Sequence, residues 1–324
     1  MKTFYFKYKI IGQILFVIIF LSTSNAIALD KFNKSDNLSN YFSGILLLNE
    51  NLYDESFKFL KKLNGLEKVH TNYAAKYLYS LVNSGNFKEA FNYSRNLEKK
   101  KLDSFESHLI TGVYYLKSTN LKLAQKYFLK AKNKNSRFIL NNFVSNSLYN
   151  VANFSNLNVD QAFLELKKLD ERFDNFKNIQ NVFLNCFFDS SNTQYLFEKL
   201  TSNEKTDFSR YNYFFASYLA SKGKIGEAKE IIDLSLKSHP KNLLLNQYKI
   251  DLINERNINV FECKKQEHII SEILYITSNA LSSQSIYPLS NFYLNLAKYL
   301  NEDFHFYNDL LAENFYKIKN FDNG

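Results

Sequence analysis

The chain has 324 residues, of which 45% are hydrophobic and 23% are charged, so it can bury a substantial core and is not disordered throughout. Only 2 prolines and 8 glycines are present. They are too few for the turns of a many-stranded sandwich, barrel or propeller, and we therefore expect an all-α protein. The formal net charge of +9 is a mild basic excess for this length.

The N-terminus has the three parts of a secretory signal peptide. Residues 1–9 are basic, residues 10–21 are almost entirely apolar, and Ala26 and Ala28 stand at the spacing of a cleavage site. The apolar run is shorter than the roughly 20 residues that span a bilayer. We predict a signal peptide over 1–28, a short linker over 29–36 and export to the periplasm. The alternatives are an uncleaved membrane anchor and secretion from the cell.

An internal repeat dominates the rest of the chain. Ser56, Ala90 and Ala124 are 34 residues apart, and each opens a similar apolar segment at helical spacing. Gly112 lies 12 residues before Ala124, where a small residue lets two helices of a hairpin approach closely. Tyr115 and Phe128 would fill the space between successive hairpins.

This 34-residue pattern resembles that of the tetratricopeptide repeat (TPR) family. The resemblance implies a right-handed superhelical solenoid of antiparallel helix hairpins, with several degenerate repeats. It divides the chain into an array over 37–256, an inserted loop over 257–267 and a continuation over 268–324 whose last repeat is incomplete. The residues expected to pack the repeats are Gly44, Ser56, Ala90, Gly112, Tyr115, Ala124, Phe128, Ala131, Ala216, Gly223, Ala228 and Pro240.

The last repeat has a first helix over 303–318 and no second helix. Solenoids normally place a polar cap at their ends, so this end should leave an apolar face uncovered. Our hypothesis is that the sequence is a piece of a longer array, or that a partner covers this face.

The first helices of TPR hairpins line a concave groove, so the resemblance also indicates a binding surface. Its predicted residues are Tyr41, Ile45, Leu48, Ala75, Tyr79, Val82, Leu109, Val113 and Leu116. They lack the Lys and Asn of TPR clamps that hold a terminal carboxylate, and they suit an apolar helix or extended peptide instead. The alternative is that these side chains pack against neighbouring helices of a tightly wound array.

The lysine clusters fall at or just beyond the ends of second helices, where cations complement the helix dipole. Nucleic-acid binding would need a continuous basic stripe, commonly with arginine, and only 5 Arg occur. We therefore expect no nucleic-acid partner.

Nothing in the sequence forms a recognisable catalytic or cofactor motif. Cys263, His268 and Glu272 come nearest to a metal or thiol site, and we expect no catalytic residue, metal or cofactor. Cys186 and Cys263 are either bridged or unpaired, and we favour unpaired thiols. The sequence thus predicts a non-catalytic protein–protein interaction scaffold in the cell envelope. The alternative is a TPR arm or subunit of an envelope machine for cell-wall synthesis, secretion or outer-membrane assembly.

Overall fold

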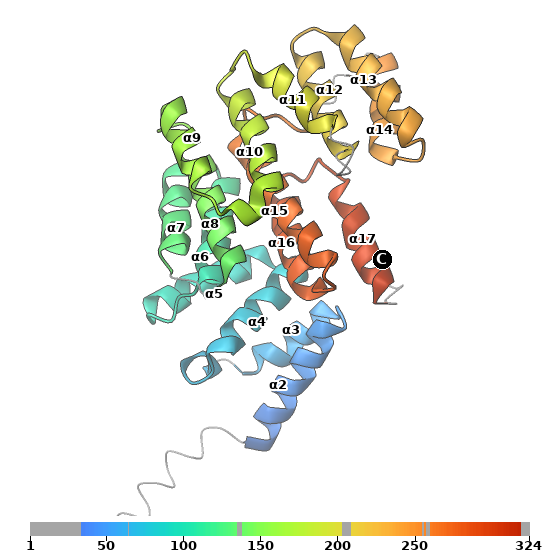
Figure 1. Cartoon of the computed structure of the whole chain (residues 1–324). Coiled ribbons are helices and arrows are strands. Elements are labelled where there is room, and N and C mark those ends of the chain that lie inside the picture. Colours follow the sequence, from blue (N-terminus) through green and yellow to red (C-terminus); the bar gives the residue numbers. More distant parts are fainter. Residues whose placement is uncertain are drawn as a thin grey trace, which may run out of the picture.

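The computed structural model describes residues 34–63, 65–134, 138–202, 209–254, 256 and 260–318. These residues form sixteen α-helices and two short 3₁₀ helices, with no strand among them (Figure 1). The prediction of an all-α protein is confirmed. The predicted signal peptide, most of the linker and the turn expected at 320–322 lie outside the described residues.

The helices differ in length from 9 to 17 residues. In chain order they are α2 (Lys34–Asn49), α3 (Tyr53–Lys61), α4 (Thr71–Asn83), α5 (Phe87–Lys99), α6 (Phe105–Lys117), α7 (Leu121–Asn133), α8 (Ile139–Ala152), α9 (Val159–Lys167), α10 (Asp174–Phe187), α11 (Thr193–Thr201), α12 (Ser209–Ser221), α13 (Ile225–Ser238), α14 (Leu243–Ile253), α15 (Gln266–Ser282), α16 (Tyr287–Leu300) and α17 (Tyr307–Lys317). The 3₁₀ helices are Leu66–Lys68 and Glu171–Phe173.

From α2 to α14, each helix packs against the next one in the chain. Small residues bring paired helices together: a Cβ atom on Gly112 of α6 would stand 2.6 Å from the ring of Phe128 in α7. Gly44 of α2 approaches Leu60 of α3 in the same way. Ala90, Ala124, Ala216 and Ala228 are fully buried, so most of the residues expected to pack the repeats lie inside the helical layers.

Ion pairs join neighbouring helix pairs at a spacing close to the repeat length. Lys100 Nζ lies 2.9 Å from Glu67 Oε1, and Lys222 Nζ lies 3.0 Å from Asp189 Oδ1. Lys134 Nζ lies 2.6 Å from Asp103 Oδ2. Lys100 and Lys134, which belong to the lysine clusters predicted at helix ends, therefore also connect one pair to another. A pair with both partners exposed, such as Lys222–Asp189, contributes about 0–1 kcal/mol.

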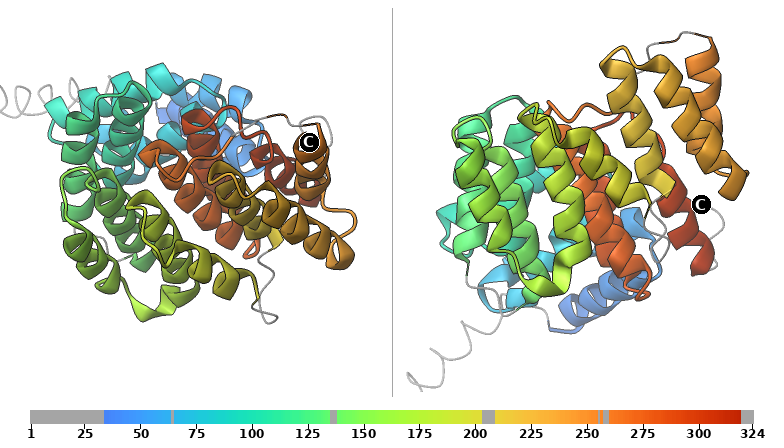
Figure 2. Two further views of the ribbon diagram at one scale, coloured as in Figure 1. Left: turned by 90° about the horizontal axis from the view of Figure 1, so that it is seen from above. Right: turned by 45° about the horizontal axis from the view of Figure 1, so that its top comes forward.

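The C-terminal helices α15 and α16 lie on the inner side of the curve that α2 to α14 follow (Figure 2). They form a closely packed pair, and they contact helices far away in the sequence: α15 contacts α8 and α10, while α16 contacts α2, α4 and α6. The expected continuation of the array after the inserted loop instead turns back and fills its inside.

Helix α17 packs back onto the first helix pair. Phe315 of α17 is buried with Leu48 of α2 and Tyr53 of α3. A buried hydrogen-bond chain supports this contact, because Asn314 Nδ2 donates to Asn291 Oδ1 at 2.6 Å and Asn291 Nδ2 donates to Tyr53 Oη at 2.6 Å. The prediction of an uncovered apolar face on the last helix is therefore wrong for the described residues.

Two glycine substitutions should separate close packing from helix propensity. Gly112→Ala should destabilise the protein by about 1–3 kcal/mol, because the new methyl group overlaps the Phe128 ring. Gly226→Ala in α13 has nothing within 4 Å and should stabilise it by about 0.5–1 kcal/mol. Urea unfolding of both variants checks this. Equal effects of the two substitutions would contradict the packing role of Gly112.

Candidate functional site

The groove predicted from the sequence is not open in the structure. Leu48, Val82 and Leu109 are each 0% exposed, and Val113 and Leu116 are also buried. Tyr41, Ile45, Ala75 and Tyr79 are partly buried. The expectation of an accessible groove is wrong for the five buried residues, which the chain's own helices cover. The alternative, that side chains of this set pack against other helices, holds for them.

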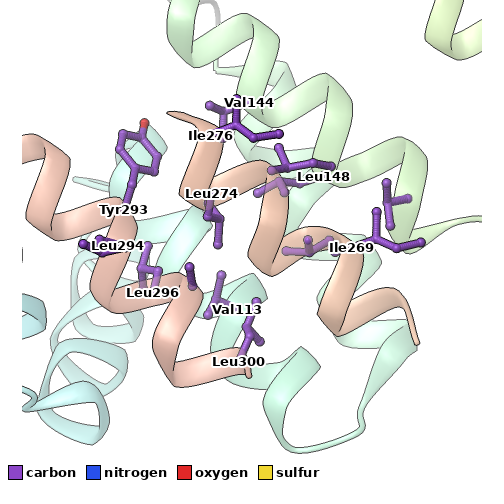
Figure 3. Close-up of a cluster of buried hydrophobic side chains, with 14 of the residues drawn as sticks. Val113, Val144, Leu148, Ile269, Leu274, Ile276, Tyr293, Leu294, Leu296 and Leu300 are labelled. Carbon is purple, nitrogen blue, oxygen red and sulfur yellow. The ribbon is translucent and has the colours of Figure 1, made fainter. Parts of the chain in front are cut away.

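Helices α15, α16 and α17 supply the cover. Val113 of α6 and Val144 and Leu148 of α8 face the side chains of α15 and α16 (Figure 3). The Tyr79 ring lies 4.8 Å from that of Phe292 in α16, and the Phe87 ring stacks on Tyr299 at 4.1 Å. The apolar and aromatic character of this inner face was therefore read correctly, but the occupant is a segment of the same chain.

A disulfide fixes the segment that leads into α15. Cys186 of α10 and Cys263 are bonded, with their Cα atoms 6.0 Å apart, so the expectation of two unpaired thiols is wrong. Beside the bond, Lys264 Nζ donates to the carbonyl oxygen of Phe187 and pairs with Asp189. At the start of α15, Gln266 Nε2 donates to the carbonyl oxygen of Val151 at 2.6 Å.

A buried ion pair fixes the middle of α15. Arg210 Nε and Nη2 of α12 each lie 2.9 Å from a carboxylate oxygen of Glu272, whose side chain is 0% exposed. The guanidinium also lies over the Tyr275 ring at 3.9 Å and the Phe304 ring at 4.6 Å. Burial lowers the pKa of Arg210, but the Glu272 carboxylate outweighs it and holds that pKa above its usual value.

The residues that came nearest to a reactive site in the sequence are each held in a different contact. Cys263 is in the disulfide and Glu272 pairs with Arg210. His268 Nδ1 accepts a hydrogen bond from the Glu262 backbone N–H at 2.9 Å. Burial lowers the pKa of His268 to about 4. Within the described ranges, no three His, Cys, Asp or Glu side chains gather as a metal site.

A cleft opens beside α15. It has a volume of about 540 Å³ and lies between α10, α12, the start of α14, α15 and α17. Arg210 and Tyr275 form part of its wall, and Lys241 and Asp309 stand at its edges. The sequence gave no sign of it, because its residues come from five separate helices.

Helix α14 carries a second exposed feature. Leu243, Ile250 and Ile253 are 68%, 49% and 59% exposed, although Leu244, Leu245 and Leu252 on the same helix are buried. The chain continues from α14 to α15 on the inner side, so α14 is the last helix in the consecutive series. Its outer apolar face, which we define as Leu243, Ile250 and Ile253, therefore lies uncovered by the described helices.

Comparison with protein-family models and with curated proteins found no match to this chain. None of the helices in the described part combines the length and the apolar composition needed to cross a bilayer.

Reducing the disulfide should lower the free energy of unfolding by about 4 kcal/mol. The bond joins two residues 77 positions apart and so restricts the conformations of the unfolded chain. Urea unfolding with and without dithiothreitol measures this. The Cys186→Ser/Cys263→Ser variant is the control and should not respond to the reductant. Equal stability of the oxidised and reduced protein would contradict the assignment of the bond.

His268 should make stability depend on pH. Its pKa is about 4 in the folded protein against 6.5 ordinarily, so between these values the unfolded chain binds a proton that the folded chain does not. Stability should fall by about 3 kcal/mol as the pH drops from 6.5 to 4.

The variant His268→Gln keeps a hydrogen-bond acceptor without a titrating ring. It should reduce the number of protons taken up on unfolding by about one, so that stability depends less on pH. His305→Gln, at an exposed position, is the matched control and should leave it unchanged. Unfolding curves recorded from pH 7 to pH 4 provide the measurement. An unchanged slope in His268→Gln would show that other groups cause the dependence.

Proposed function

We propose that the protein is a non-catalytic protein–protein interaction scaffold of the bacterial cell envelope. The 34-residue pattern and the consecutive packing of helix pairs support a TPR-type right-handed superhelix for α2 to α14. The Cys186–Cys263 bond supports an exported location, because disulfides persist in oxidising compartments.

The single observation that carries the binding role is the outer apolar face of α14. Three large aliphatic side chains are exposed there on a helix of 11 residues. In a helical array each pair covers the face of the pair before it, and an end that faces water alone is normally polar. An apolar end favours a partner that continues the series. We therefore assign the partner-binding surface to α14, and not to the covered groove.

The partner that fits this surface is an amphipathic helix or helical hairpin. Leu243 and Ile250 are two helical turns apart on α14, and Ile253 lies beside them, which is the spacing that the apolar stripe of a packed helix presents. Lys249 is paired with Asp233 at 2.7 Å. The surface thus offers mainly apolar contacts.

The alternative is an arm or subunit of an envelope machine whose catalytic part lies elsewhere. The same α14 surface would then be a permanent interface. Recovery of one fixed complex from envelope extracts favours this alternative, whereas a monomer that binds its partner reversibly favours the scaffold.

A photo-crosslinking amino acid at Ile250 should form a discrete protein adduct in the organism that encodes the chain, in the periplasmic or membrane fraction. The same probe at Tyr195 of α11, which is exposed on another helix, is the control. Ile250→Glu should reduce partner recovery at least tenfold, because it places a charge in an apolar contact. Leu164→Glu on α9 is the matched substitution at an exposed aliphatic residue on another helix.

Both variants should unfold at the temperature of the unmodified protein, since both side chains are exposed. The assignment to α14 is refuted if Leu164→Glu loses the partner equally, or if Ile250→Glu keeps it. Adducts confined to the cytoplasmic fraction would refute the envelope location.

A further inference from the structure

The cleft between α10, α12, α14, α15 and α17 has the size of a small-molecule site. Its volume of about 540 Å³ falls within the range of about 300–1,000 Å³ found for ligand pockets. Phe176, Ile179 and Ile276 supply apolar walls, and Asn175 and Asn279 supply exposed amides. Mixed walls of this kind suit a ligand with both a polar and an apolar part.

Arg210 places a fixed hydrogen-bond donor in the wall. Its Nε and Nη2 atoms are held by Glu272, and its guanidinium is stacked on Tyr275 at 3.9 Å. Nη1 has no hydrogen-bond partner in the described part of the chain, although the side chain is only 15% exposed. A guanidinium has five N–H groups, so Arg210 still has N–H donors for a ligand. Glu272 and Tyr275 have already fixed the position of these donors.

Two further charges of opposite sign stand at the cleft. Lys241 precedes α14, whose N-terminal end adds a partial positive charge, and Asp309 belongs to α17. Neither side chain has an ion-pair partner among residues that the structure describes. Partial desolvation raises the pKa of Asp309, although its side chain is exposed, and the positive charge of Arg210 opposes this rise.

This arrangement disfavours simple ions. An anion would meet the carboxylate of Asp309, and a cation would meet the ammonium of Lys241 and the N–H donors of Arg210, whose charge Glu272 already balances. A ligand with both charges on neighbouring atoms satisfies all three groups. In a peptide these two charges lie at opposite ends of the chain, whereas a free amino acid carries them on one carbon atom.

We propose that this cleft binds a free α-amino acid with an apolar or aromatic side chain. The ligand carboxylate accepts hydrogen bonds from Arg210 Nη1 and Lys241, and the ligand ammonium donates to Asp309. The side chain of the ligand packs against Phe176 and Ile179. This site does not depend on the scaffold role, because the purified chain would bind the amino acid without a partner.

Isothermal titration of the full chain with L-phenylalanine and L-leucine tests the proposal, with saturable binding of one ligand per chain expected. Four relatives of L-phenylalanine test its separate parts. Phenylalaninamide lacks the carboxylate, N-acetylphenylalanine lacks the ammonium, glycine lacks the side chain, and phenylalanylglycine moves the carboxylate to a second residue. Each should bind at least tenfold more weakly than L-phenylalanine.

Lys241→Gln and Asp309→Asn should each weaken binding by about 10- to 100-fold, since each removes the charge that strengthens a hydrogen bond to the ligand. Both side chains are exposed, so the fold should survive both changes. Lys122→Gln on α7 and Asp160→Asn on α9 are matched exposed controls and should bind normally.

The absence of saturable binding at millimolar concentrations overturns the proposal. It is also overturned if phenylalaninamide or N-acetylphenylalanine binds as well as the free amino acid, or if Asp309→Asn binds normally. Tighter binding of phenylalanylglycine would assign the cleft to the end of a peptide instead, and equal binding of glycine would exclude the apolar wall.

Discussion

The packing of α15 and α16 against the inner side of the helical series is the contact on which the rest of the structure depends. Apolar side chains of α4, α6 and α8 meet those of two helices more than 100 residues later in the chain. This burial closes most of the inner face, leaves the 540 Å³ cleft beside α10, α12 and α14, and brings α17 onto the first helix pair. Each aliphatic side chain buried here contributes about 1.5–3 kcal/mol relative to exposure.

Two specific contacts set where α15 lies within this apolar interface. The Arg210–Glu272 pair is buried, so the cost of removing both charges from water offsets much of their attraction. Its effect is better described as positional, because a shift of α15 by one turn would leave a buried charge unpaired. The Cys186–Cys263 bond acts differently, by restricting the unfolded chain. Together they connect α10 and α12 to the helix that fills the inside.

The sequence predicted the helical fold and the paired helices because their signals are local. Gly112, Ala124 and Phe128 meet within one helix pair, and their spacing records that contact directly. The position of α15 and α16 left no such record, since an inner face is apolar whether a partner or the chain itself covers it. One missed signal was α15, where apolar residues from Ile269 to Leu281 occur on every side, as in a core helix. The spacing of Cys186 and Cys263 could not distinguish a bridge from two thiols.

Closure of the chain on itself also changes how its stability is distributed. In an open solenoid each repeat contacts only its neighbours, and stability is nearly a sum along the chain. Here Asn83 of α4 donates to the carbonyl oxygen of Pro288, and Asn291 reaches Tyr53, so opening one region exposes surface on distant helices. Helices α13 and α14 take little part in this closure, because in the described chain they contact mainly α12 and each other. They therefore form a region that can open without breaking the contacts of the closed core, and it is also where the exposed apolar face and one wall of the cleft are located. A surface that must admit a partner or a small ligand is best placed on helices whose movement leaves the closed core intact.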